Sequence, residues 1–136
     1  MVAPGVVTAD VPGRHVLTRS HRLTSSQSFA QTVRRGRRAG TSTLVLHLAV
    51  PADVAVDAHA KVGFVVSKAV GGSVTRNLVK RRLRHLVRER LSSLPDAAAL
   101  VVRANPAAGS ASFAVLAADF DTALDRLLGS IARSSA

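Results

Sequence analysis

The chain contains no cysteine, tryptophan or tyrosine, and only 3% of its 136 residues are aromatic. The lack of cysteine excludes disulfides and thiolate zinc sites, so a reduced, intracellular and cytoplasmic protein is the default expectation. No apolar run approaches the roughly 20 residues that a helix needs to span a bilayer. Because 47% of the residues are hydrophobic, one domain with a core of valine, leucine and alanine is expected.

Acidic residues are scarce as well: eight Asp and Glu stand against 19 Lys and Arg, which gives a net charge of +11. Seven of the basic residues lie within 14–38 and seven more within 76–90, and Glu89 is the only acid in either segment. Such segregation favours a polyanion as partner, nucleic acid first and an anionic membrane second. The alternative is a solvated basic face, but solubility needs a net charge of only about 2–8.

No grouping of residues typical of a catalytic site is present. The acids are scattered, and only Asp121 and Asp125 lie one helical turn apart. That pair could supply two ligands to Mg²⁺, and a solvated helix face is the alternative interpretation. The five histidines show no metal-ligand spacing: His15, His21, His47, His59 and His85. We therefore expect neither a catalytic residue nor a metal site in the protein.

Hydrophobic periodicity predicts helices over 24–35, 73–94 and 112–133 and strands over 43–50, 61–68 and 98–104. Thr24 or Ser25 can cap the first helix and Gly36 can end it. Gly71 and Gly72 form a flexible joint before the second helix. Helices that pack on a sheet make an α/β (α+β) two-layer sandwich. We expect a disordered leader over 1–13, one domain over 14–133 and a short tail over 134–136.

The helix over 73–94 is predicted to be amphipathic. Its apolar stripe has helical spacing, and the residues on the opposite side are polar or basic. The stripe is Val79, Leu83, Leu86 and Val87, and the other face carries Asn77, Arg81, Arg84 and Arg88. Basic side chains on one face neutralise backbone phosphates, and arginine can also grip a phosphate with two hydrogen bonds.

In the strand over 43–50, Leu44, Leu46 and Leu48 alternate with Val45 and His47. The face that carries His47 could offer a stacking platform to single-stranded nucleic acid. The alternative interpretation is that His47 is an ordinary, half-exposed strand residue.

The stretch 61–84, KVGFVVSKAVGGSVTRNLVKRRLR, resembles the protein subunit of bacterial ribonuclease P. That family has a strand that ends in Ser-Lys, a glycine joint, and then Arg-Asn and Lys-Arg on a basic helix. The matching residues are Ser67, Lys68, Gly71, Arg76, Asn77, Lys80, Arg81, Leu83 and Arg84. The segment with Arg22, Leu23, Phe29, Val33 and Gly36 is similar to the family's first helix. Departures include Val33, where the family often has an aromatic, and His47, where it often has Tyr.

The resemblance implies the order α-β-β-β-α-β-α with a sheet of about four strands, like domain 2 of ribosomal protein S5. It also implies a left-handed βαβ crossover, against the usual rule. The holoenzyme would be an endoribonuclease that removes the 5′ leader from precursor tRNA. A catalytic RNA would do the chemistry with Mg²⁺ that it holds itself. The protein would bind that RNA and the single-stranded leader, and it would lower the Mg²⁺ requirement.

The resemblance also assigns roles to residues. The leader-binding cleft would lie between the first helix and the sheet and be lined by Phe29, Val33, His47, Val65, Ser67 and Lys68. The catalytic RNA would meet Arg76, Asn77, Lys80, Arg81, Arg82, Arg84 and Arg88. Further basic contacts to RNA would come from Arg22, Arg34, Arg35, Arg37 and Arg38.

Three other classes of protein remain open on the residues. A structural or ribosome-associated RNA-binding protein fits the composition equally well. A protein-only nuclease would need grouped metal-binding acids. A membrane binder would need a wide apolar helix face with interfacial tryptophan, which this chain lacks.

Overall fold

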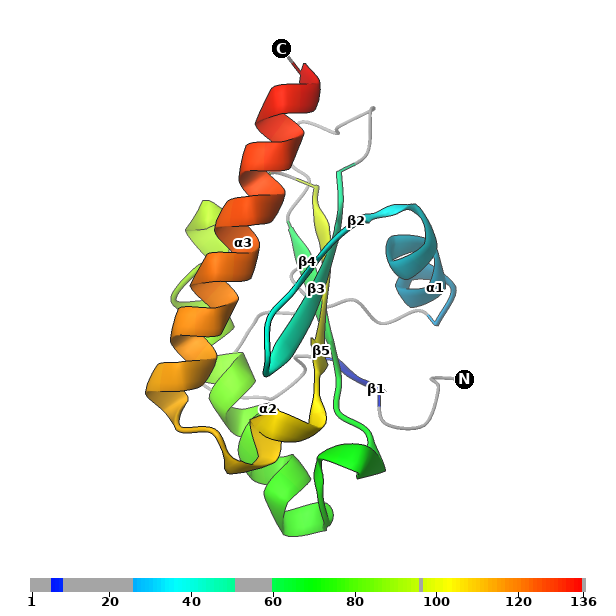
Figure 1. Cartoon of the computed structure of the whole chain (residues 1–136). Helices are drawn as coiled ribbons and strands as arrows, with labels where there is room; N and C mark the ends of the chain where they lie inside the picture. Colours follow the sequence, from blue (N-terminus) through cyan, green and yellow to red (C-terminus); the bar gives the residue numbers. More distant parts are fainter. Residues whose placement is uncertain (1–5, 9–25, 51–59, 96, 136) are drawn as a thin grey trace.

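The protein is a sheet with helices on both of its faces (Figure 1). The structure is a computed structural model and describes residues 6–8, 26–50, 60–95 and 97–135. Helix α1, Ser26–Arg35, lies on one side of the sheet, and α2, Ser73–Arg88, and α3, Phe113–Ser135, lie on the other. No helix among the described residues is long and apolar enough to cross a membrane.

The sheet has five strands in the order β1-β4-β5-β3-β2. Their bounds are Val6–Thr8 for β1, Arg37–Gly40 for β2, Leu44–Ala49 for β3, Lys61–Val65 for β4 and Ala99–Ala104 for β5. Neighbours are antiparallel except for β4 and β5, which are parallel and joined through α2. The mixed α/β class is as predicted. Helices cover both faces of the five-stranded sheet, however, where two layers and about four strands were expected. The hand of the β4–α2–β5 crossover stays a prediction.

Strands β1 and β2 add to what periodicity predicted. Val6–Thr8 fall in the expected leader and pair with β4 at the sheet edge. The rest of 1–13, and Thr24 and Ser25 as caps, lie outside the described residues. The bounds of β2 were not predicted because its sequence, RRAG, shows no apolar alternation.

The core lies between the sheet and the pair α2 and α3. One row across it runs from Ala39 through Leu46 and Val102 to Phe64, each paired in register with the next. The predicted stripe of α2 packs on this face, and its four members are 0–1% exposed. From α3 come the buried side chains of Leu116, Phe120, Ala123, Leu124 and Leu127. We call this side of the sheet the core face.

Two elements end earlier than predicted, and both ends have a physical cause. Strand β4 stops at Val65 because the chain turns at Ser67 into a 3-10 helix, Lys68–Val70. Helix α2 stops at Arg88, where the guanidinium of Arg90 donates to the carbonyl of Leu86 at 3.0 Å. A cation that satisfies a carbonyl of the last turn is a common way to end a helix.

Candidate nucleic-acid interface

The side of the sheet that faces α1, here called the α1 face, carries a different set of residues. Partners in register share a face, which places Arg38, His47, Val101 and Gly63 in one row across β2, β3, β5 and β4. The next row holds Gly40, Val45, Arg103 and Val65. Two arginines and a histidine therefore project from this face, whereas the opposite face is apolar in these strands apart from Arg37.

Helix α1 is held close to this face at its C-terminal end. The amide of Gly36 donates to the carbonyl of Thr32 at 2.8 Å. A Cβ on Gly36 would lie 2.3 Å from the oxygen of Thr32 and 2.9 Å from that of Leu48. Glycine thus ends the helix, as predicted, and the close approach of the two backbones is what requires it.

A cavity of about 520 Å³ opens between α1 and the α1 face. Val33 reaches it from α1 and is 45% exposed. The described residues of the lining are Val33, Arg38, Val45, His47, Ser67, Ala69, Arg103, Ala104, Asn105 and Pro106. We call this space the α1 cavity. It contains apolar surface, hydrogen-bonding groups, the imidazole ring of His47 and two guanidinium groups. Grooves that bind single-stranded nucleic acid combine positive charge with side chains on which bases stack.

His47 is the most constrained residue of the α1 cavity. It is 6% exposed, which contradicts the half-exposed interpretation, because α1 covers the strand on this side. Its Nδ1 is buried and has no hydrogen-bond partner. Burial in the first place, and then the charges of Arg38 and Arg103, lower the pKa of His47 below its ordinary value. The imidazole is therefore neutral at physiological pH.

The predicted cleft residues are only partly brought together. Val33, His47 and Ser67 line the α1 cavity. Val65 lies on the same face but packs against Val101, and Lys68 is exposed at the start of the 3-10 helix. The side chain of Phe29 lies outside the described residues.

The sequence interpretation missed six residues of the described lining: Val45, Ala69, Arg103, Ala104, Asn105 and Pro106. Arg103 could have been found, because an arginine interrupts an otherwise apolar strand at the position where the α1 face is expected. Asn105 follows the strand without any pattern, and its amide donates to the carbonyl of Thr41 at 3.1 Å. Only the paired strands show that these residues meet His47.

Helix α2 presents the second basic surface. Arg81 is exposed, while Arg76, Lys80, Arg84 and Arg88 are partly buried. The Nε of Arg76 is buried without a hydrogen-bond partner. Burial, and then the nearby charge of Arg81, lower the pKa of Arg84, although a guanidinium keeps its proton. Crowded cations of this kind are stabilised when a polyanion approaches.

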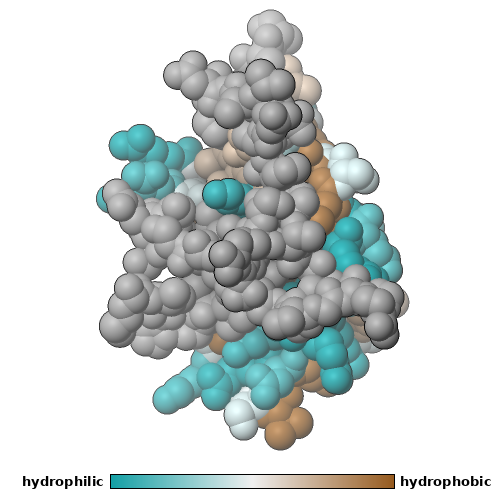
Figure 2. Space-filling view, turned by 180° about the vertical axis from the view of Figure 1, so that it is seen from behind, coloured by the Kyte–Doolittle hydropathy of each residue, from teal (hydrophilic) through white to brown (hydrophobic). Residues whose placement is uncertain are grey.

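Figure 2 shows hydrophilic residues gathered at the lower end of the molecule, where the 3-10 helix Lys68–Val70 and the start of α2 lie in Figure 1. Arg82 differs from its neighbours, because its guanidinium donates to the carbonyl of Ala111 at 2.7 Å. That bond ties α2 to the segment before α3. Arg82 therefore uses at least part of its hydrogen-bonding capacity inside the fold.

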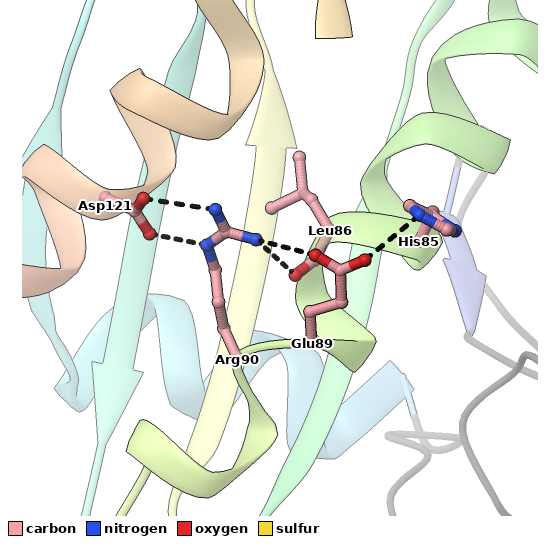
Figure 3. Close-up of polar contacts among 5 residues, drawn as sticks. All are labelled: His85, Leu86, Glu89, Arg90 and Asp121. Atoms are coloured by element: carbon pink, nitrogen blue, oxygen red, sulfur yellow. Dashed lines mark hydrogen bonds and ion pairs between the residues drawn. The ribbon is translucent and has the colours of Figure 1, made fainter. Parts of the chain in front are cut away.

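The far end of α2 is fixed to α3 by an ion pair (Figure 3). The Nε and Nη2 of Arg90 donate to the two oxygens of Asp121, at 2.5 and 3.1 Å. The hydrogen bond to Asp121 raises the pKa of Arg90. Beside it, Nε2 of His85 lies 3.1 Å from Glu89, and the His85 ring meets Phe113 edge-on.

The arginines around β2 form the third basic group. Arg34 and Arg35 are exposed at the end of α1, and Arg38 lines the α1 cavity. Arg37 donates to the hydroxyl of Ser130 on α3 at 2.7 Å. Arg22 lies outside the described residues.

Two of the three carboxylates of α3 form hydrogen bonds within the fold. Asp121 binds Arg90, and Asp119 accepts a hydrogen bond from the hydroxyl of Thr43 at 2.5 Å. The described residues contain no group of three or more His, Asp or Glu side chains that could hold a metal ion. The donor set of this part of the chain therefore does not fit a protein-held Mg²⁺.

Fold and surface together define a class, a mixed α/β protein with basic residues at the α1 cavity and along α2. Residues 17–128 match a family model described as Ribonuclease P. A ribonuclease P protein component from a Nocardioides species is 56% identical over 112 residues, covering 82% of this chain and 95% of the relative. One from Streptomyces bikiniensis is 55% identical over 122 residues, covering 84% and 97%. The chain belongs to the family of ribonuclease P protein components.

Solved structures show the same fold. The ribonuclease P protein of Staphylococcus aureus superposes with a TM-score of 0.66 at 20% identity, covering 76% of this chain and 91% of that one. The protein from Thermotoga maritima gives 0.62 at 18% identity, covering 77% and 93%. Membership in the family makes the chain a subunit of the ribonuclease P endoribonuclease, in partnership with its RNA.

Proposed function

We propose that the protein binds the catalytic RNA of ribonuclease P through α2 and holds the single-stranded 5′ leader of precursor tRNA in the α1 cavity. The observation that carries the proposal is the α1 cavity itself, where Arg38 and Arg103 have no acidic residue beside them in the described part of the lining. The cytoplasm, where precursor tRNA is made in bacteria, is the proposed location.

The two surfaces are close enough to act on one substrate. Ala69 lies in the lining of the α1 cavity, and Gly72, three residues later, caps α2. A leader in the cavity would therefore lie next to the helix that meets the RNA. Parallel strands β4 and β5, joined through α2, produce this proximity. We propose that their connection is the left-handed crossover implied by the resemblance.

Catalysis by this route is differential binding. The substrate carries a leader and the mature product does not, so only the substrate gains the contacts of the cavity. Because the described protein residues do not fit Mg²⁺, the proposal leaves the metal on the RNA subunit. The arginines of α2 would reduce phosphate repulsion near the reacting bond, and the complex would then work at lower Mg²⁺.

The test is reconstituted cleavage. Purified protein is mixed with a bacterial ribonuclease P RNA and precursor tRNA at low Mg²⁺, and release of the 5′ leader is followed. Cleavage at the mature 5′ end that requires both components, and tighter binding of precursor than of mature tRNA, are expected. RNA binding without any effect on cleavage would instead indicate a structural RNA-binding protein.

A matched pair of variants locates the RNA surface. Arg81→Gln on α2 should raise the protein concentration needed for half-maximal cleavage. Arg133→Gln, at the exposed end of α3, should not. Equal effects of the two substitutions would contradict the assignment of α2.

A further inference from the structure

The positions of Arg38, His47 and Arg103 are fixed by backbone pairing. Arg38 is the direct partner of His47 across β2 and β3. His47 is paired with Val101, and Arg103 lies two residues further along the same face of β5. Direct partners have Cβ atoms about 4.5–5.5 Å apart and diagonal neighbours about 7–8 Å apart. The two guanidinium groups therefore flank the imidazole from neighbouring strands.

The charges at this place are unbalanced. Among the described residues, the lining of the α1 cavity contains two arginines and no Asp or Glu. The charged groups that act on the His47 ring are Arg38 from β2 and Arg103 from β5. Val33 from α1 and Ser67 after β4 line the same space and carry no charge. An anion between the strands would be attracted by both cations and would offset part of their charge.

The unpaired Nδ1 of His47 points to the same ligand independently of charge. A buried ring nitrogen without a partner is unfavourable, whether it carries a proton or a lone pair. In the imidazolium both nitrogens donate. An anion beside the ring would therefore satisfy Nδ1 if the imidazole were protonated, and nothing else in the described lining does so.

We propose that Arg38, His47 and Arg103 form a site for one backbone phosphate of the leader, and that His47 binds it by taking up a proton from solvent. The proposal rests on the proposed function, since it names which group of the leader the α1 cavity holds. In the free protein, His47 is neutral between two cations. The bound phosphate favours the protonated imidazole instead. Binding of leader and binding of a proton are then coupled.

The direction of the coupling follows from the two states. In the free protein burial and the two arginines hold the pKa of His47 below its ordinary value. The phosphate raises it in the complex. Affinity for the leader should therefore increase as the pH falls from above the bound-state pKa to below the free-state pKa. Uptake of one proton limits the increase to about tenfold per pH unit.

The first measurement uses the full chain and a single-stranded RNA of about eight nucleotides, within the usual site size of single-strand binders. The imidazole resonances are titrated with pH with and without this RNA, and His47 is assigned by its loss in His47→Phe. The expected result is a pKa for His47 that rises when the RNA is added. A pKa that the RNA leaves unchanged would overturn the proposal.

The second measurement compares affinities across pH. The wild type should bind the RNA more tightly at lower pH, whereas His47→Phe should lose that dependence. The matched control is His85→Phe, which removes a half-exposed histidine on α2, away from the α1 cavity. Equal pH dependence in the wild type and His47→Phe would overturn the proposal. Arg103→Gln should weaken binding and lower the salt dependence by about one phosphate contact.

Replacing one charged phosphate of the RNA backbone by a neutral linkage shows which phosphate the site binds. Methylphosphonate is placed at one linkage of the RNA at a time. One position should lose both affinity and pH dependence. Uniform small losses at every position would show general electrostatic attraction in place of a site. Cleavage by the reconstituted holoenzyme is measured separately. If the protein stimulates cleavage but its RNA binding is not coupled to proton uptake, this inference alone is refuted. If the protein does not stimulate cleavage, the proposed function is refuted.

Discussion

The two faces of the sheet differ in whether their buried side chains have packing and hydrogen-bond partners. On the core face Leu46, Phe64 and Val102 are 0% exposed and packed on each other and on two helices. On the α1 face His47 is almost as buried, but one of its nitrogens lacks a partner and two arginines stand beside it. Alternation along the same strands thus separates the residues that stabilise the fold from those available for binding.

The largest effect that would test this division is a truncation on the core face. Leu46→Ala should lower the free energy of unfolding by about 2–5 kcal/mol, because it leaves a cavity in a closed core. Val33→Ala, on the open side, should change it by no more than about 0.5 kcal/mol. Urea denaturation measures both. Similar losses for the two variants would mean that the α1 side contributes to the core as well.

The attachment of α1 to its face can be tested at Gly36. Gly36→Ala places a methyl group against two carbonyl oxygens of the backbone, which cannot rotate away, and should cost about 1–3 kcal/mol. Gly40→Ala is the control, since its nearest neighbour would be a Val45 methyl group at 3.8 Å. The first variant should also weaken binding of single-stranded RNA. Unchanged stability would show that α1 can shift without cost.

Helix α2 shows the same contrast, because one of its arginines is hydrogen-bonded within the fold and its neighbour is exposed. Arg82→Ala removes the hydrogen bond to Ala111 and should cost about 1 kcal/mol of stability. Arg81→Ala should leave stability nearly unchanged but reduce the salt dependence of binding to ribonuclease P RNA by about one contact. Thermal unfolding and a salt titration separate the two effects. A reversed pattern would place Arg82 on the RNA.

The smallest effect concerns the pH dependence of stability. The folded state holds His47 with a lowered pKa, so the unfolded chain binds more protons as the pH falls through about 6.5. Stability should therefore fall from that pH down to the folded-state pKa, and His47→Phe should lose this component. His85→Phe serves as the control. The comparison is made by urea denaturation across pH, and parallel profiles for wild type and His47→Phe would contradict it.

Part of the candidate site could be predicted from the sequence, because local residue patterns determine which side chains share a face. The stripe from Val79 to Val87 predicted the packing of α2 correctly, since helical spacing alone decides which residues share a face. His47 was a candidate from its place in an alternating strand. Its burial was not foreseen, because burial depends on α1, which crosses the strand from a separate part of the chain.

The sequence by itself determined the family, the charge segregation and the two residue periods that make a sheet and its helices. The tertiary structure alone decided that Arg38 and Arg103 flank His47. Pairing of β2 with β3 places Arg38 beside it, and pairing of β3 with β5 brings in Arg103 from more than 50 positions away. The tertiary structure likewise decided that Arg82 and Arg90 bind within the fold while Arg81 stays exposed. Charge is a property of each residue, but whether it is compensated depends on what folding places beside it.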